Sequence, residues 1–156
     1  MELILLKFDN KVATERKKKM AVRKIIRDQL ILMRKSADAK PDDKKIAEDL
    51  RDTLLANEDK AIGLAANMIG KSKKIIAVFI GPFPVVMLNP KIVKSEGKYL
   101  TEEGCLSLDG VRKTARYEKI WVEYEDLSFT KRSAEYDGIA AEAIQHEIDH
   151  TKGKII

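Results

Sequence analysis

The sequence predicts a single α+β domain in which antiparallel or mixed β-sheets pack around a C-terminal helix. Short apolar stretches typical of strands occupy the middle of the chain, and helical apolar patterns lie on either side of them. No repeat, long linker or low-complexity segment divides the 156 residues. A chain of this length is sufficient for one domain with a substantial core.

The first predicted helix begins at Asp42 or Asp43, either of which can cap it, and ends near Asn57. Apolar residues recur there with helical spacing. The residues that share its apolar face are Ile46, Leu50 and Leu54.

Strands are predicted next along the chain. Residues 74–80 are rich in β-branched and aromatic side chains, and a Gly-Pro-Phe-Pro turn separates them from a second strand at 85–88. An Asn-Pro pair then breaks the chain before a third strand around Ile92. Residues 119–125 alternate apolar and polar side chains, which predicts a strand exposed on one face.

The last helix is expected to start after Asp137-Gly138 and to end at Gly153, a suitable C′ glycine. Its predicted inner face consists of Ile139, Ala143, His146, Glu147 and His150.

This helix contains the only two histidines of the chain, His146 and His150. A spacing of four places both imidazoles on one helix face, with Glu147 beside them. Two ring nitrogens and a neighbouring carboxylate are the components of a hydrolytic metal site, namely two ligands and a proton acceptor for water. The alternative is a surface helix that carries two histidines by chance.

A third ligand is expected upstream, because the six residues after His150 include no His, Cys, Asp or Glu. Cys105, the only cysteine, stands out because it lies in a glycine-flanked segment that we interpret as a loop. A single cysteine cannot form an internal disulfide, so its thiol is free to bind metal. Two histidines and one thiolate leave a fourth position for water.

Three motifs in this order resemble those of the peptide deformylases, which remove the N-formyl group from the initiator methionine of new bacterial chains. They are Gly63-Leu64-Ala65-Ala66, Glu103-Gly104-Cys105-Leu106-Ser107 and Gln145-His146-Glu147-Ile148-Asp149-His150. The similarity runs from about Met20 to Ile156. We therefore predict a deformylase-like domain over residues 20–156, preceded by a basic extension over residues 1–19.

The resemblance implies a role for each matching residue. Cys105, His146 and His150 would bind one divalent metal ion, with Fe(II) expected in the cell and Zn, Ni or Co able to take its place. Glu147 would act as general base, and the backbone N–H of Leu106 would stabilise the oxyanion.

Further residues match positions that contact substrate in the family. The predicted substrate-binding residues are Ile62, Gly63, Glu103, Arg116 and Ile139. For the two isoleucines, core packing is the alternative interpretation. Glu103 would brace the cysteine segment or be a solvated acid, and Arg116 would otherwise be a surface charge.

The first motif departs from the family pattern at one important position. The family has a glutamine that donates a hydrogen bond to the oxyanion, and Met68 occupies that position here. A thioether cannot donate a hydrogen bond. Asn67 is adjacent, but a neighbouring side chain is expected to point elsewhere.

Charge is concentrated at the N-terminus. Residues 1–24 hold eight Lys or Arg against three acids, an excess equal to the +5 net charge of the whole chain. This pattern is consistent with a ribosome contact through RNA phosphates or with a solvated extension, but not with sequence-specific nucleic-acid binding. No apolar stretch predicts a membrane span, and one free cysteine favours the cytoplasm.

Three functions from different classes remain open. The first is an active hydrolase of N-formylmethionyl peptides. The second is a deformylase-like paralogue with weak activity or another N-acyl substrate. The third is a non-enzymatic metal-binding or ribosome-associated module, against which the intact Glu147 argues because a structural site needs no base.

Overall fold

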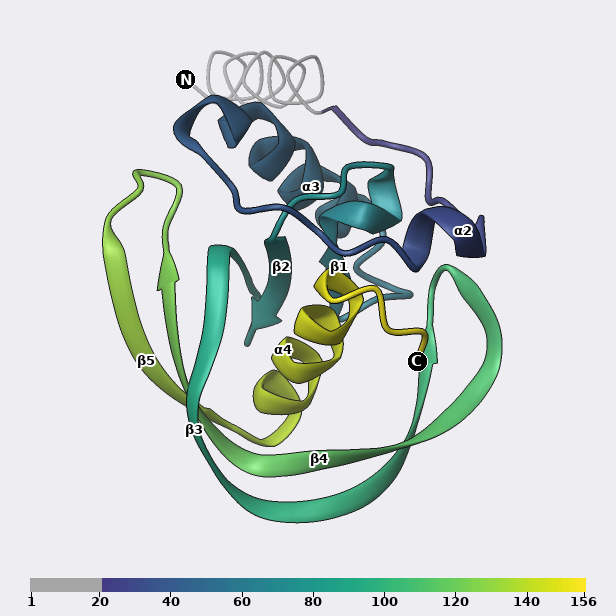
Figure 1. Ribbon diagram of the computed structural model, residues 1–156, viewed down its shortest axis with the longest axis vertical. Helices are drawn as coiled ribbons and strands as arrows, with labels where there is room; N and C mark the ends of the chain where they lie inside the picture. The colour runs from purple at the N-terminus through teal and green to yellow at the C-terminus, as the bar shows by residue number, and fades with distance from the viewer. Residues whose placement is uncertain (1–20) are drawn as a thin grey trace, which may run out of the picture.

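The computed structural model describes residues 21–156 and shows one curved sheet wrapped around the C-terminal helix (Figure 1). All five strands pair antiparallel with their neighbours in chain order. The strands are β1 (Gly63–Ala65), β2 (Ile75–Ile80), β3 (Phe83–Cys105), β4 (Leu108–Glu125) and β5 (Lys131–Asp137). The predicted α+β class is confirmed.

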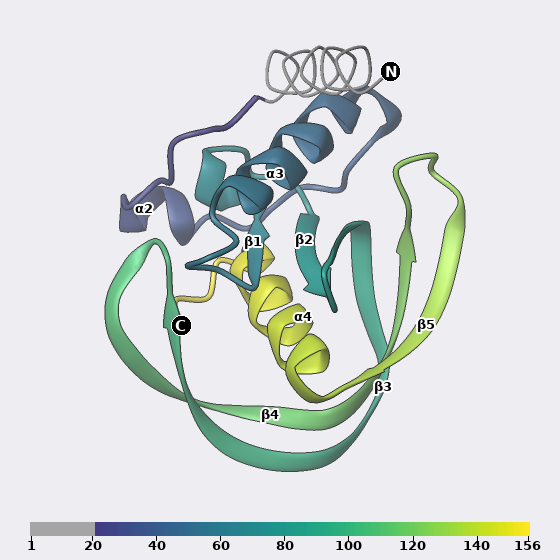
Figure 2. The ribbon, with the colours of Figure 1, turned by 180° about the vertical axis from the view of Figure 1, so that it is seen from behind.

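The helices flank this sheet and one of them fills its concave side. The α-helices are α2 (Gln29–Leu32), α3 (Lys44–Ala56) and α4 (Gly138–Thr151), and the 3₁₀ helices are η1 (Pro41–Asp43) and η2 (Ala66–Ile69). Figure 2 shows α4 within the curve of the sheet and α3 beyond the short strands β1 and β2. Among the described residues, no helix is long and apolar enough to cross a membrane.

The long ribbon formed by β3 and β4 differs from the predicted short strands. The expected break at Asn89-Pro90 is wrong, because β3 continues through it with a shift in register between Leu88 and Lys91. Asn89 adopts a left-handed φ of 51°, which produces the bulge without ending the strand. The strand predicted at 119–125 is the end of β4, and β5 was not predicted.

The two longer helices begin and end close to the predicted residues. Asp43 does not cap α3 with its side chain; its Oδ2 instead accepts a hydrogen bond from the Lys40 backbone N–H at 2.8 Å. Gly153 follows α4 with a φ of 76°, and a Cβ there would collide with the carbonyl oxygen of Met33. Ile139 is 67% exposed, so its placement on the inner face of α4 is wrong.

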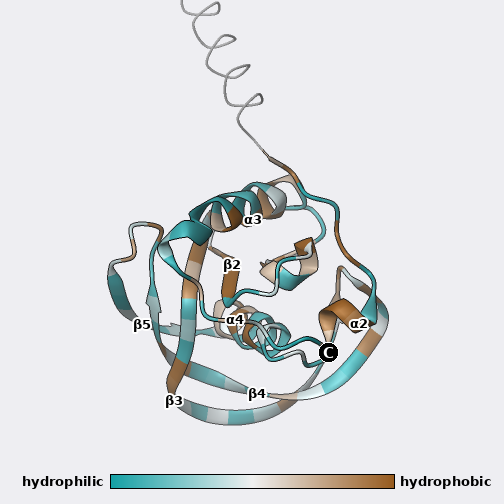
Figure 3. Ribbon diagram, turned by 45° about the horizontal axis from the view of Figure 1, so that its top comes forward, coloured by the Kyte–Doolittle hydropathy of each residue, from teal (hydrophilic) through white to brown (hydrophobic). Residues whose placement is uncertain are grey.

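The core lies between α4, α3 and the short strands. Leu50 and Leu54 of α3 and Ile144 of α4 are fully buried, as is most of β2. Figure 3 shows this contrast, with a hydrophobic β2 and a largely hydrophilic β3–β4 ribbon. The inner face of α4 is therefore held rigidly against the sheet, which fixes the side chains of the site.

Candidate metal centre and active site

Three metal-binding side chains converge at the C-terminal half of α4. His146 and His150 lie one helical turn apart, and their Nε2 atoms are 3.0 Å from each other. Cys105 Sγ is 3.4 Å from His150 Nε2. The three ligand atoms all lie within 4.8 Å of one another. This is the arrangement predicted from the sequence.

The sheet delivers Cys105 to the two histidines. Cys105 is the last residue of β3 and pairs with Leu108, so the segment predicted as a loop is a strand end and a tight turn. Within this turn the Ser107 backbone N–H donates to Cys105 Sγ at 3.4 Å. The turn therefore holds the sulfur, a potential metal ligand, beside the two histidines.

A buried ion-pair network supports His146. His146 Nδ1 lies 2.8 Å from Glu103 Oε1, and Arg116 donates to both Glu103 oxygens at 2.6–3.1 Å. Arg116 also donates to Asp149 Oδ2 at 2.7 Å. Although burial opposes it, these hydrogen bonds from His146 and Arg116 lower the pKa of Glu103 to about 2. The carboxylate therefore fixes the His146 ring with Nε2 directed at the ligand cluster.

Glu147 is buried beside the histidines. Its Oε1 lies 3.8 Å from His146 Nε2, and its Oε2 has no hydrogen-bond partner among the described residues. Burial raises the pKa of Glu147 to about 7, partly offset by the charge of His146. A carboxylate with a pKa near neutral is suited to accept and return a proton. A Cβ on Gly63 would lie 3.0 Å from Glu147 Cγ, so glycine leaves room for this side chain.

The protein groups already favour a positive charge at the point where the ligands meet. Burial lowers the pKa of His146, but hydrogen bonds to Cys105 and Glu103 outweigh it and raise that pKa to about 10. Burial and the nearby His146 charge lower the pKa of His150 to about 3. Of the two rings, His146 thus carries the proton, which a divalent cation would displace. One sulfur and two imidazole nitrogens suit Zn or Fe(II), so the donor set fits a metal ion.

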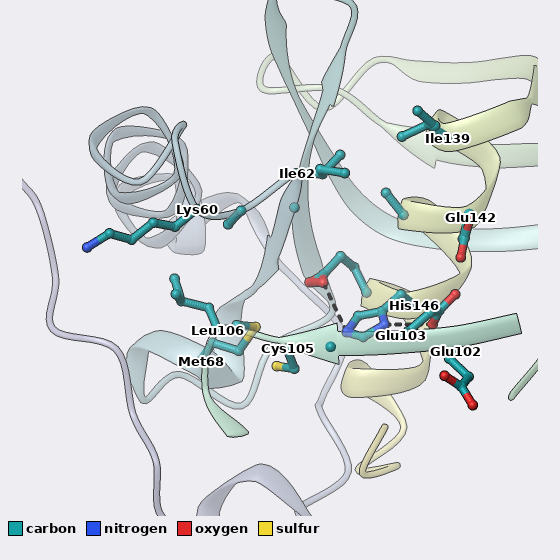
Figure 4. A pocket seen from close by; sticks show the side chains of 15 residues that line it. Lys60, Ile62, Met68, Glu102, Glu103, Cys105, Leu106, Ile139, Glu142 and His146 are labelled. Carbon is teal, nitrogen blue, oxygen red and sulfur yellow. Dashed lines mark hydrogen bonds and ion pairs between the residues drawn. The ribbon is translucent and has the colours of Figure 1, made fainter. Parts of the chain in front are cut away.

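Two residues of the ligand cluster, Cys105 and His146, line a pocket of about 320 Å³ (Figure 4). Ile62 and Ile139 lie at one end of it, and Met68, Leu106 and Cys105 at the other. Of the residues expected to contact substrate, Ile62, Gly63, Glu103 and Ile139 line the pocket. Sequence reasoning missed Lys60, Glu102 and Glu142 in this lining, whereas Ala143 was predicted on the inner face of the helix with His146. Glu142 could have been found, because it precedes His146 by four residues on the same helix face.

Comparison with known proteins identifies the family. The sequence model described as "Polypeptide deformylase" matches residues 22–156. The chain belongs to the peptide deformylase family. A deformylase of Clostridium beijerinckii is 48% identical over 135 residues, which cover 86% of this chain and 99% of that protein. A deformylase of Desulfitobacterium hafniense is 35% identical, covering 72% and 75% of the two chains.

Solved deformylase structures share the fold. That from Legionella pneumophila superposes with a TM-score of 0.77 at 33% identity, covering 86% of this chain and 83% of that one. The Acinetobacter baumannii deformylase with Met-Ala-Ser bound gives a TM-score of 0.77 at 28% identity, covering 86% and 96%. The family is metal-dependent, in agreement with the ligand cluster of this chain.

Arg116 does not have the position expected of a substrate contact. Its side chain is 4% exposed, it is not among the residues that line the pocket, and its donors are directed at Glu103 and Asp149. The reason is that β4 places Arg116 between the buried Glu103 carboxylate and the partly buried Asp149 carboxylate, which require a cation. We therefore infer that Arg116 keeps the Glu103 carboxylate in position.

The departure from the deformylase pattern at Met68 is visible in the pocket. Met68 is 1% exposed and lines the cavity, and its Sδ accepts the Ala65 backbone N–H at 3.4 Å. Asn67 points away, because its Nδ2 donates to the carbonyl oxygens of His150 and Leu32. Asn67 therefore does not supply the side-chain donor that Met68 lacks, as the sequence led us to expect.

Proposed function

We propose that this chain is a metal-dependent hydrolase that removes the N-formyl group from N-formylmethionyl peptides of nascent chains. The observation that carries the proposal is the buried Glu147 carboxylate beside three converging ligand atoms, at a pocket that Cys105, His146 and Glu147 line. The Met-Ala-Ser peptide bound by the Acinetobacter baumannii relative supports a peptide with N-terminal methionine as the product.

Cys105, His146 and His150 would hold one divalent cation, with Fe(II) proposed in the cell and Zn, Ni or Co as alternatives. When bound, such a cation lowers the pKa of a water molecule and polarises the formyl carbonyl. Glu103 keeps the His146 ring oriented through its Nδ1, and Arg116 keeps Glu103 in place.

Glu147 moves the protons. Its Oε2, which none of the described residues engages, accepts a proton from the water that attacks the formyl carbon. As the new C–O bond forms, the formyl C=O becomes an oxyanion; the C=O then re-forms as the C–N bond breaks, and Glu147 returns the proton to the leaving nitrogen. The products are formate and a peptide with a free α-amine.

The pocket lining orients the substrate. Ile62, Gly63 and Ile139, with Ala143, form the apolar surface for the methionine side chain beside His146. Glu103 also lines this pocket, within reach of a bound peptide. The Leu106 N–H is proposed as the remaining protein donor to the oxyanion, since Met68 offers none.

We also propose that residues 20–156 form the catalytic domain and that the basic residues 1–19 contact the ribosome. This extension lies outside the described residues, so the contact rests on its charge alone. The proposed reaction is cytoplasmic, where nascent chains are synthesised.

Formate release from a formyl-Met-Ala-Ser peptide tests the function directly. The protein is loaded anaerobically with Fe(II) and compared with a Zn-loaded sample, with Glu147→Gln as the matched inactive control. We expect formate from the wild type and very little from the variant. Absence of formate from the Fe(II)-loaded wild type, with the metal shown to be bound, would contradict the proposal.

A further inference from the structure

Asn67 is a fully buried polar residue that the proposed mechanism does not use. It is 0% exposed and lies in η2, directly before Met68. Its Nδ2 donates to the His150 carbonyl oxygen at 2.8 Å and to the Leu32 carbonyl oxygen at 3.2 Å. One amide group thus joins three segments that are far apart in the sequence, namely α2, η2 and the end of α4.

The bond to His150 is made at the C-terminal end of α4, where the last four backbone carbonyls lack partners within the helix. The His150 carbonyl accepts the Gly153 N–H at 3.0 Å, and Asn67 adds a second, shorter bond from outside. The side chain of His150 points toward Cys105 and His146. Its backbone is therefore anchored immediately next to the proposed ligand.

The residue that follows Asn67 in the chain, Met68, belongs to the pocket wall. Its sulfur is held by the Ala65 N–H. Because Asn67 and Met68 are consecutive residues of one short helix, the Asn67 amide fixes the position of this wall relative to His150. Without it, the wall and the ligand would be joined only through packing.

We propose that Asn67 is a positioning residue. It holds His150 in place for metal binding and fixes the position of the pocket wall at Met68 relative to His150. The inference rests on the proposed metal site. A purely structural asparagine would lower the stability of the protein when replaced but would leave the metal affinity of the folded protein unchanged. A positioning residue lowers both.

The test compares Asn67→Ala and Asn67→Asp with Asn89→Ala. The aspartate variant keeps the shape of Asn67 but lacks both N–H donors. Asn89 is a matched control, since its amide also bonds one distant segment, with Ala39 N at 2.8 Å and Ala39 O at 3.0 Å, away from the ligands. The affinity of each folded protein for Co(II) is measured by chelator competition well below its melting temperature, together with the Co(II) absorption spectrum.

We expect both Asn67 variants to bind Co(II) about 10–100-fold more weakly, as found when groups that orient metal ligands are removed, with a shifted spectrum. Asn89→Ala should lose stability but keep wild-type affinity and spectrum. Asn67 variants that are less stable yet bind Co(II) like the wild type would overturn the proposal. Should Asn67→Ala not fold, Asn67→Asp and Asn67→Ser, which retains one donor, give the same comparison.

The Co(II) measurements test the role of Asn67 separately from the proposed deformylase activity. A wild type that binds Co(II) but releases no formate contradicts the deformylase proposal and leaves Asn67 to be judged by affinity alone. A wild type that does not bind Co(II) overturns both.

Discussion

Replacement of Arg116 by methionine tests the buried network that holds His146. The Arg116 guanidinium makes three contacts with Glu103 at 2.6–3.1 Å and one with Asp149 at 2.7 Å, at a side chain that is 4% exposed. Methionine has a similar length but removes the Arg116 cation from the buried Glu103, and leaves Asp149 with only Lys154, whose Nζ is 3.8 Å from it. Breaking a buried ion pair from one side costs about 3–5 kcal/mol. For a chain of this size each kcal/mol lowers the melting temperature by about 2–4 °C.

We therefore expect Arg116→Met to melt about 10 °C below the wild type, as followed by calorimetry. Metal affinity should fall as well, because Glu103 is then free to move away from His146. The double variant Glu103→Gln/Arg116→Met should recover part of the stability, since the uncompensated buried charge of Glu103 is removed. A change of less than about 1 kcal/mol, the value of an exposed ion pair, would refute the assignment of Arg116 to this network.

Four further predictions concern single residues. Cys105→Ser should sharply reduce metal content under matched purification, and full occupancy would remove Cys105 from the ligand set. Glu147→Gln should keep its metal but lose about 10²–10⁴-fold in hydrolysis, so loss of metal as well would make Glu147 structural. Met68→Gln should raise kcat/KM by up to about 10²–10³-fold if its new amide reaches the oxyanion. An unchanged, high value would show that the loss of the glutamine is compensated. The pKa of Glu103 is lowered from 4.5 to about 2, so its contribution to stability is complete above pH 4.5 and is lost as the pH falls toward 2. Wild type should therefore lose stability more steeply than Glu103→Gln across that range, and equal slopes in acid denaturation would contradict this.

The helical part of the site was predictable because it depends on local spacing. Residues four apart on an α-helix share a face whatever the rest of the fold, so His146 and His150 had to lie together once α4 formed. Cys105 stood out as the only cysteine and the family motifs agreed, and the sheet does bring its sulfur to the histidines. Asn67 was predicted to point away from the pocket for an equally local reason, since it is adjacent to Met68.

The features that depend on long-range pairing were not predictable from single residues. Asn89-Pro90 reads locally as a strand break, yet pairing with β4 carries β3 through it as a bulge. Cys105 reads as a loop residue because of its glycine neighbours, and the same pairing makes it the end of a strand. Arg116 carries a charge that predicts exposure, but Glu103 and Asp149 meet it in the interior from β3 and α4. In each case the deciding partner lies many residues away.

The consecutive residues Asn67 and Met68 show how the two kinds of information combine. The chain has a hydrogen-bonding side chain next to the position where the family has one, which suggests a simple exchange of roles. The structure argues against this exchange, because Asn67 already uses both N–H donors on the carbonyls of His150 and Leu32. Turning it toward the pocket would break two buried hydrogen bonds; the His150 carbonyl would keep its bond from the Gly153 N–H, but the Leu32 carbonyl would lose the Asn67 donor, at a cost of about 1–3 kcal/mol. That cost is comparable with the gain from one oxyanion donor, about 2.7–4 kcal/mol, so an exchange of roles offers no clear advantage. A donor at Met68 must therefore be restored at Met68 itself, and the rate of Met68→Gln measures what this site does without it.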